Sequence, residues 1–293
     1  MTDDVSRARI AFIGLGNMGG GMAANLAKAG LEVRAFDLSS DALSRARSAG
    51  CDTCQSAAEA VAGADAVVTM LPAGRHVAQV YDEAVISNVA RGTLLIDCST
   101  IDVATARANA GRAREAGLES VDAPVSGGIA AANAGTLTFM VGGSEEGFAR
   151  AQPILAAMGK AVIHAGGHGA GQAAKICNNM ILGATMAATA EALALAERLG
   201  LDPQRFYDIA SVSSGQSWSL TSYCPLPGVG PDSPADRGYE GGFAAALMLK
   251  DMRLAMEAAH SVGAQVPMGE RATQLYESID GSRDFSSIIS RYR

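Results

Sequence analysis

Short apolar runs alternate with longer alanine-rich runs through the first half of the chain. The apolar runs have the length and composition of β-strands, and a glycine, a proline or a polar cluster closes each of them. They span residues 9–16, 31–37, 64–72, 92–100, 118–128, 136–143 and 161–167. The alanine-rich runs read as helices, and glycine ends the first two of them, at 18–30 and 41–50. This alternation predicts βαβ units and a doubly wound parallel sheet in an α/β domain.

The pattern changes after residue 168. A run rich in alanine, leucine and methionine, from Gly171 to Leu199, has no proline and predicts a helix of about 28 residues, far above the usual length. Apolar residues cover most of its surface, which is typical of a helix buried in a core or between subunits. Further helices are expected at 202–213 and 243–263. The sequence therefore predicts an α/β domain over residues 1–168 and an all-α domain over 169–293, joined by the long helix.

Composition narrows the range of partners. The chain has 293 residues, of which 48% are hydrophobic and 18% charged, so it can build two packed cores. Its formal net charge is −7 and it has no basic run, which argues against nucleic acid and anionic membranes as partners. We also expect that no uninterrupted apolar stretch is long enough to span a bilayer. The polar start of the chain lacks the features of a signal or transit peptide, which favours a cytoplasmic protein.

Cysteine and histidine spacings suggest metal sites that the rest of the sequence does not complete. Cys51 and Cys54 form a C-x-x-C pair, but no second pair and no spaced histidines accompany it. Two small buried residues with free thiols are therefore expected. His164 and His168 have the i, i+4 spacing of a helical metal pair, yet they fall where a strand is expected to end. The sequence predicts no metal site.

The first strand runs into a loop with the pattern G-x-G-x-x-G. Such a loop lets a pyrophosphate approach the backbone at the N-terminus of the next helix. The second strand ends in Asp37, 18 residues after Gly19, near the spacing of about 20 for an acid that binds a ribose 2′-hydroxyl. Because a carboxylate there would repel a 2′-phosphate, we predict NAD rather than NADP; local helix capping by Asp37 is the alternative. The predicted loop contacts are Gly14, Leu15, Gly16, Asn17, Met18 and Gly19.

Two other strand ends carry residues suited to a ligand. Leu71 and Pro72 close one expected strand, and Ser99 and Thr100 close another. Ligands in open α/β sheets collect at the carboxyl ends of strands. A simple strand terminator is the alternative for each pair.

The long helix carries Lys175 and Asn179 near its start, in an otherwise apolar segment. Their spacing of four places both on one helical face, about one turn apart. They follow the glycines at the expected domain boundary, where a substrate would meet the cofactor. A lysine that extends to solvent with an asparagine beside it is the alternative.

Five segments together resemble the successive motifs of the β-hydroxyacid dehydrogenase family, in order and spacing across nearly the whole chain. They are "FIGLGNMGGGMAANLAKAG", "DCSTI", "DAPVSGGIAAANAGTLTFMVGG", "GAGQAAKICNNMIL" and "FAAALMLKDMRLA". Within that family, the 3-hydroxyisobutyrate dehydrogenases are resembled by "SSGQSWS", "YCPLPGV", "GYEGGF" and "DFSSI". The resemblance implies an N-terminal Rossmann domain, a long interdomain helix and an all-α C-terminal domain.

The resemblance also implies roles for single residues. Lys175 stands at the position of the family's catalytic lysine, and Asn179 at that of a substrate-binding asparagine. The segment that holds the substrate carboxylate in the family corresponds to Ser126, Gly127 and Gly128. Lys250 matches a lysine near the substrate and the nicotinamide, with Asp251 beside it. The implied cofactor contacts outside the glycine loop are Leu71, Pro72, His76 and Thr100.

The implied reaction is NAD-dependent oxidation of 3-hydroxyisobutyrate to methylmalonate semialdehyde, as in valine degradation, with Lys175 as the general acid/base. Sibling enzymes that act on tartronate, glyoxylate or succinic semialdehyde would share every catalytic residue and are the alternative. Trp218 and Phe243 are expected to line the part of the site that distinguishes these substrates. A non-catalytic NAD-binding scaffold is a further alternative, and the presence of Lys175 with Asn179 argues against it. The apolar helices predict a homodimer or homotetramer.

Overall fold

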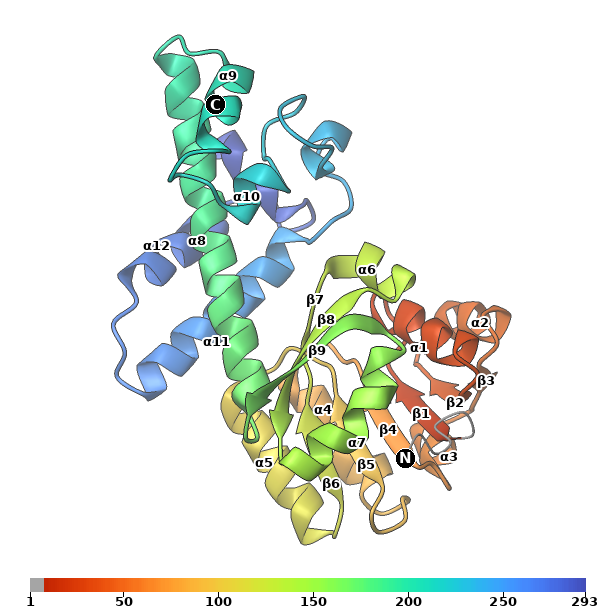
Figure 1. Ribbon diagram of the computed structural model, residues 1–293. Coiled ribbons are helices and arrows are strands. Elements are labelled where there is room, and N and C mark those ends of the chain that lie inside the picture. The colour runs from red at the N-terminus through yellow and green to blue at the C-terminus, as the bar shows by residue number, and fades with distance from the viewer. Residues whose placement is uncertain (1–7) are drawn as a thin grey trace. The chain divides into compact units, whose positions relative to one another are not determined.

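The computed structural model describes residues 8–293, which form two compact units (Figure 1). The first unit ends at Lys175, and the second runs from Ile176 to Arg293. The long helix α8 (Ala170–Arg198) contributes residues to both units, and it confirms the helix predicted from Gly171 to Leu199. The domain boundary predicted between residues 168 and 169 stays a prediction.

A nine-stranded sheet forms the centre of the first unit, in the order β3-β2-β1-β4-β5-β6-β8-β7, with β9 paired to β8. From β3 to β6 all neighbours are parallel. This is the strand order of a Rossmann sheet, so the predicted α/β fold is confirmed. The strands are β1 Arg9–Ile13, β2 Glu32–Phe36, β3 Asp52–Thr53, β4 Ala66–Thr69, β5 Leu94–Asp97, β6 Glu119–Asp122, β7 Val125–Ser126, β8 Leu137–Gly143 and β9 Gly159–Gly166.

The sheet departs from the predicted all-parallel arrangement at one side. Within the run 118–128, Ala123 and Pro124 separate the two short strands β6 and β7. The chain then turns back through the short helix α6 (Gly128–Ala134), so that β8 pairs antiparallel with both β6 and β7. The last strand, β9, returns parallel to β8.

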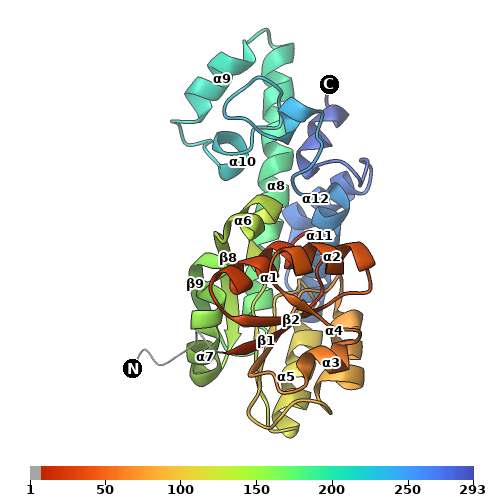
Figure 2. The ribbon, with the colours of Figure 1, turned by 90° about the vertical axis from the view of Figure 1, so that its right-hand side faces the viewer.

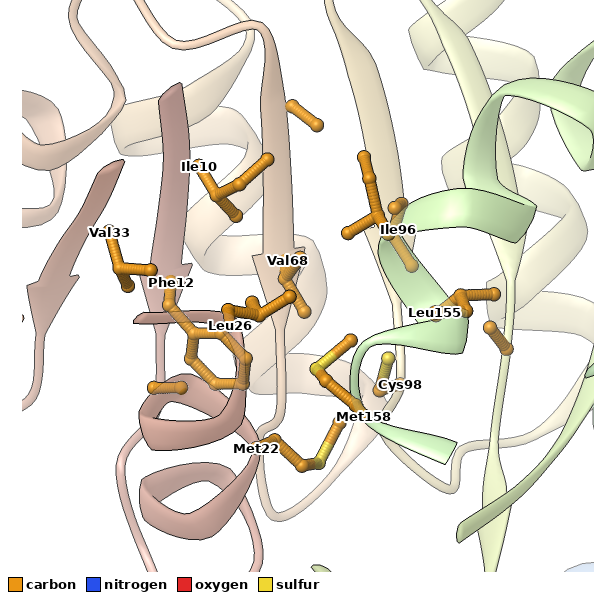
Figure 3. Close-up of a cluster of buried hydrophobic side chains, with 14 of the residues drawn as sticks. Ile10, Phe12, Met22, Leu26, Val33, Val68, Ile96, Cys98, Leu155 and Met158 are labelled. Carbon is orange, nitrogen blue, oxygen red and sulfur yellow. The ribbon is translucent and has the colours of Figure 1, made fainter. Parts of the chain in front are cut away.

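Helices cover both faces of the sheet, as the alternation along β1 requires. Ile10 and Phe12 point to one face, where they join a core with Leu26 of α1 and Leu155 of α7 (Figure 3). The intervening Ala11 and Ile13 belong to the core on the other face. The first layer contains α1 (Gly19–Lys28), α2 (Ser40–Ser48) and α7 (Glu145–Ala156). The second contains α3 (Ala57–Val61), α4 (Gly74–Val80), a π-helical turn (Tyr81–Val85) and α5 (Val103–Glu115).

The second unit is helical, as predicted. Its core combines residues of several elements, such as Met186 of α8, Met252 of α11, Tyr276 of α12 and Phe285 of the last 3₁₀ helix. In both views α10 lies beside α8, where Ser219 Oγ and Thr185 Oγ1 form a hydrogen bond of 3.1 Å (Figures 1 and 2). The remaining elements are α9 (Pro203–Ala210), α10 (Trp218–Thr221), α11 (Ala245–Ser261), α12 (Pro267–Tyr276) and two 3₁₀ helices (Pro234–Arg237 and Phe285–Arg291).

Helix α8 contradicts the expectation that no apolar stretch of the chain is long enough to span a bilayer. By length and composition alone, this one helix among the described residues could cross a bilayer. Its side chains are partly covered within the protein, for example Met186 and Leu193 in the core of the second unit. A core helix passes the same test of length and composition, so the finding is weak evidence for a membrane span.

Candidate functional site

The glycine-rich loop joins β1 to α1 at the carboxyl edge of the sheet. Gly14 has φ +98°, and a Cβ there would lie 2.2 Å from the carbonyl oxygen of Met70. A Cβ on Gly19 would lie 1.9 Å from the carbonyl oxygen of Gly14, so both positions require glycine for close packing. Gly16 is different, because a Cβ there would meet no atom within 4 Å in the described chain. The protein's own packing does not require a glycine at position 16, which leaves room for a ligand.

Asp37 follows β2 and binds this loop. Its Oδ2 accepts a hydrogen bond from Leu15 N at 2.6 Å, and its Oδ1 accepts one from Ser39 N at 2.8 Å. The side chain that caps α2 is Ser39, which accepts a hydrogen bond from Ala42 N. The helix-capping alternative for Asp37 is therefore wrong. The carboxylate stands at the loop, as its spacing predicts, although one of the predicted loop contacts, Leu15, is buried and already donates its N–H to Asp37.

The ends of β4 and β5 are joined beside the glycine loop. Leu71 N donates a hydrogen bond to Ser99 Oγ at 2.8 Å. Pro72 is exposed and Thr100 is half-buried. In α4, Nδ1 of His76 is buried and has no hydrogen-bond partner within residues 8–293. The predicted contacts therefore gather along the edge where the fold places a ligand.

Two left-handed glycines begin α6 after β7. Gly127 has φ +132° and Gly128 has φ +68°, conformations that L-residues rarely adopt. A Cβ on Gly127 would lie 2.6 Å from Cβ of Ala131, whereas one on Gly128 would meet nothing within 4 Å. The turn thus needs glycine for its backbone and, at Gly127, for its packing. Ser126 ends β7 directly before this turn.

The polar residues of the predicted chemical centre fall in both units. Lys175 and Asn179 are four residues apart in the continuous helix α8, and their side chains are 7% and 1% exposed. In the second unit, Asn179 Nδ2 donates a hydrogen bond to Oδ2 of the buried Asp251 at 2.6 Å. Lys250 Nζ lies 3.6 Å from Asp251 Oδ1. The structure therefore brings Asn179, Lys250 and Asp251 together, and Lys175 is not solvated in the way the surface-lysine alternative requires.

These features fit a dinucleotide. The space over Gly16 would admit a pyrophosphate, and Met18, at the N-cap of α1, makes no side-chain cap bond that would compete with it. The unpaired Nδ1 of His76 can bind a further polar group.

Comparison with known proteins decides the family. The protein-family model described as the NAD binding domain of 6-phosphogluconate dehydrogenase matches residues 9–167. The model described as NAD-binding of NADP-dependent 3-hydroxyisobutyrate dehydrogenase matches residues 169–292. The 3-hydroxyisobutyrate dehydrogenase of Pseudomonas aeruginosa is 51% identical over 97% of this chain and 98% of its own length. This chain belongs to the 3-hydroxyisobutyrate dehydrogenase family of β-hydroxyacid dehydrogenases.

Two other relatives are similar over nearly the whole chain. The NAD-dependent L-serine dehydrogenase of Pseudomonas aeruginosa is 48% identical over 96% of each chain. The structure described as Mycobacterium tuberculosis 3-hydroxyisobutyrate dehydrogenase with L-serine has a TM-score of 0.94 and 46% identity, and covers 97% of this chain and 98% of that one. This chain is accordingly an NAD(P)-dependent oxidoreductase, with its NAD(P)-binding domain in the first unit.

No pattern in the sequence indicated a group of buried polar residues at the carboxyl edge of the sheet. Asp122, at the end of β6, and Gln172, in the first turn of α8, are 6% and 0% exposed. Asp97 ends the neighbouring strand β5, in register with Asp122, and accepts a hydrogen bond from Thr69 Oγ1 at 2.8 Å. Asp122 lies inside the motif "DAPVSGG", but its partners are about 50 residues away, so no local spacing could reveal them.

Burial affects the titration of Asp122. It raises the pKa of the carboxyl from 3.8 to about 6, and the negative charge of Asp97 adds to the rise. The N–H groups of Gly169 and Gln172 act in the opposite direction, because they stabilise the carboxylate.

Four aromatic residues link the two positions expected to sense the substrate. Trp218 is half exposed and stacks on Tyr223 at 5.0 Å between ring centroids, and Tyr223 stacks on Phe285 at 5.4 Å. Phe243 meets the edge of Phe285 at 5.8 Å. The buried carboxylate of Asp284 accepts hydrogen bonds from Tyr223 OH and Phe243 N, which fixes this row.

The C-x-x-C cysteines are buried in the protein, and the two spaced histidines do not share a helix. All five cysteines are free, and four, including Cys51 and Cys54, are buried; Cys177 is exposed. Burial raises the pKa of the Cys51 thiol to about 11, which makes it a poor nucleophile. His164 lies in β9 and its ring stacks on that of Phe148 in α7. His168 lies after the end of β9. Among residues 8–293, no group of three or more histidine, cysteine or acidic residues could hold a metal ion.

Proposed function

We propose that this protein oxidises 3-hydroxyisobutyrate to methylmalonate semialdehyde with NAD. The observation that carries the proposal is 51% full-length identity to a 3-hydroxyisobutyrate dehydrogenase, together with a lysine and an asparagine one turn apart at the start of α8. The substrate is a small 3-hydroxy acid, and its carboxylate, hydroxyl and C2 methyl each need a different partner.

Different residues of this chain bind the substrate, transfer its proton and hold the cofactor. Ser126 and the backbone N–H groups of Gly127 and Gly128 bind the carboxylate, which selects acids over simple alcohols. Asn179, oriented by Asp251, donates to or accepts from the substrate through neutral hydrogen bonds. Lys175 Nζ, as a neutral amine, takes the hydroxyl proton while the C–H bond at the same carbon breaks. The bound dinucleotide supplies the hydride acceptor, and the glycine loop, Asp37, Lys250 and the strand-end residues hold it.

The low exposure of Lys175 favours this role. Lys175 is 7% exposed as a whole residue, so bulk water has little access to it and a bound substrate would be its main partner for proton transfer. In the reverse direction the same ammonium group returns the proton to the carbonyl oxygen.

Changing Lys175 to alanine tests this assignment. We expect kcat to fall by about 10²–10⁴-fold, because the proton acceptor is lost, while NADH binding measured by fluorescence is unchanged. Lys160→Ala, at an exposed position of β9 in the first unit, is the matched control and should behave as the wild type. Turnover of Lys175→Ala within a few-fold of wild type would remove Lys175 from the mechanism.

L-Serine is the second candidate substrate, and the 48% identity to an NAD-dependent L-serine dehydrogenase favours it. L-Serine and 3-hydroxyisobutyrate share a carboxylate and a primary hydroxyl on C3, and differ at C2, which carries an ammonium or a methyl group. A methyl group needs an apolar wall, whereas an ammonium group needs oxygen acceptors. The aromatic row of Trp218 and its neighbours favours the methyl group.

Steady-state kinetics on a panel of acids decides between them. The panel contains both enantiomers of 3-hydroxyisobutyrate, L-serine, glycerate, glycolate and 4-hydroxybutyrate, with isobutanol as the substrate that lacks a carboxylate. The proposal expects the highest kcat/KM for one 3-hydroxyisobutyrate enantiomer and no turnover of isobutanol. A higher value for L-serine would select the second candidate, and a higher value for glycerate, glycolate or 4-hydroxybutyrate would reject both.

The preference for NAD rests on Asp37. Asp37→Asn keeps the size of the side chain and one acceptor for Leu15 N or Ser39 N, but removes the negative charge that repels a 2′-phosphate. We expect the ratio of kcat/KM for NAD over NADP to fall by about tenfold or more. Asp41→Asn, at an exposed position in the first turn of α2, is the control. An unchanged ratio in Asp37→Asn would mean that another group selects the cofactor.

A further inference from the structure

The first turn of α8 is held on the sheet by two buried side chains. The carboxylate of Asp122 accepts hydrogen bonds with both oxygens, from Gly169 N to Oδ1 at 2.7 Å and from Gln172 N to Oδ2 at 2.9 Å. It therefore satisfies two N–H groups at the N-terminus of α8 and places a negative charge at the positive end of the helix dipole.

Gln172 ties the same turn to the segment after β5. Its Nε2 donates to the carbonyl oxygen of Ser99 at 2.7 Å, and its Oε1 accepts from Ile101 N at 3.0 Å. Ser99 in turn accepts the hydrogen bond from Leu71 N through its Oγ. Hydrogen bonds thus join the predicted cofactor contact Leu71, through Ser99, to the helix turn that precedes Lys175, and the predicted contact Thr100 lies between the two residues that Gln172 binds.

The same turn lies in close contact with the backbone of the sheet. A Cβ on Gly171 would lie 2.3 Å from the carbonyl oxygen of Met140 and 2.6 Å from that of Asp122. A Cβ on Gly142 would lie 2.6 Å from Asp122 Oδ1 and 2.7 Å from Gly171 N. The start of α8 therefore lies directly on the backbones of β6 and β8, so a small displacement of this turn would change its contacts with both strands.

We propose that Asp122 and Gln172 are positioning residues that hold Lys175 in its working place relative to the cofactor-binding edge; we call this pair the α8 clamp. The proposal rests on the role assigned to Lys175 under the proposed function. Lys175 lies three residues after Gln172, so any tilt or slip of the first turn moves its Nζ. A displacement of about 1 Å can lower the rate of a catalysed step by about a hundredfold.

The central variant is Asp122→Asn. Asparagine has one acceptor oxygen, so its amide group would face one of the two N–H donors that now bind the carboxylate. Asp102→Asn is the matched control, because Asp102 caps α5 in the same unit with a single oxygen, which accepts from Thr105 N at 2.7 Å. Asparagine can keep that one bond. Gln172→Met is the second clamp variant, since it keeps the side-chain length but removes the bonds to Ser99 and Ile101.

Three measurements test the clamp, and two of them need no activity. Hydrogen–deuterium exchange of the peptide 167–176 should be about tenfold faster in both clamp variants, because charge-assisted or paired hydrogen bonds are lost. Acylation of Lys175 by acetic anhydride, measured by mass spectrometry against the exposed Lys28 and Lys160, should also be faster. The kcat should fall about tenfold or more, with unchanged NADH affinity and a larger primary deuterium isotope effect. Asp102→Asn should match the wild type throughout.

Each contrary result has a definite meaning. Exchange and acylation at wild-type rates in both clamp variants would overturn the clamp itself. Faster exchange and acylation with wild-type kcat would overturn its part in catalysis. If the wild-type protein oxidises none of the hydroxy acids, the proposed function fails, and the exchange and acylation rates still decide whether the pair holds Lys175.

Discussion

Gly127 and Gly128 give the turn before α6 its backbone conformation, and we propose that their N–H groups bind the substrate carboxylate. Both have positive φ, and a Cβ on Gly127 would overlap Ala131. Gly127→Ala should therefore displace the N–H groups that begin α6. We expect KM for the 3-hydroxy acid to rise by about 10–100-fold while NADH binding is retained, which kinetics and fluorescence titration would measure.

A helical glycine gives the control for that substitution. Gly111 lies in α5 without a positive φ, and a Cβ there would meet nothing within 4 Å in the described chain, so Gly111→Ala should leave KM unchanged. An equal rise in KM for NAD and for the acid in Gly127→Ala would show that the turn supports the whole first unit rather than the carboxylate.

Single residues also show which parts of the candidate site could be predicted from the sequence. The spacing of Asp37 from the glycine loop predicted that its carboxylate would stand beside that loop, because both the strand and the turn are local features. Asp122, Gln172 and Asp284 act through partners far away in the sequence, and no local pattern reports such contacts. The roles of the predicted site residues stay predictions until the variants are measured.

At the scale of elements, the long helix α8 was predictable because its composition is distinctive over nearly 30 residues. The reversal of β8 was not, because a strand that pairs antiparallel and one that pairs parallel have the same apolar pattern. The break at Ala123 and Pro124 was visible in the sequence, but its effect on strand direction depends on how the chain returns through α6.

The Asp122 carboxyl should make the attachment of α8 sensitive to pH. Its folded-state pKa of about 6 exceeds the ordinary value of 3.8, so between these values the folded protein holds a proton that the unfolded chain has lost. The free energy of unfolding should fall as pH rises through this window, by about 3 kcal/mol relative to Asp122→Asn. Urea unfolding of both proteins from about pH 4 to pH 7 measures the difference. A difference that does not change with pH would contradict the raised pKa.

At the scale of the whole molecule, the chemical groups are divided between two compact units. The glycine loop, the Gly127 turn and Lys175 belong to the first unit, whereas Asn179, Lys250 and Asp251 belong to the second. The sequence predicted both folds, because one half alternates strands with helices and the other half has none of that alternation.

Exposed apolar side chains in and beside α9 favour a homo-oligomer. Helix α9 contains no fully buried residue; its Ile209 is 58% exposed, and Val212, just after the helix, is 85% exposed. Leu199 nearby in the sequence is 76% exposed. We propose that a second copy of the chain covers this segment, because exposed apolar groups of this size are unfavourable in water.

Size-exclusion chromatography with light scattering tests the oligomer. The double variant Ile209→Asp and Val212→Asp should shift the protein toward a monomer, since two charges would be buried without partners. Ile163→Asp, at a position 56% exposed in the first unit, is the control and should keep the wild-type mass. An unchanged mass in the double variant would place the interface elsewhere.

The exposed thiol of Cys177 gives the protein a ready-made attachment point for a reporter. The other four cysteines are buried, so a maleimide dye should react at this position without any of them being replaced. Cys177 is two residues beyond Lys175 in α8, next to the junction of the two units. Fluorescence from a dye at this position could follow the helix in real time while the enzyme binds cofactor and turns over.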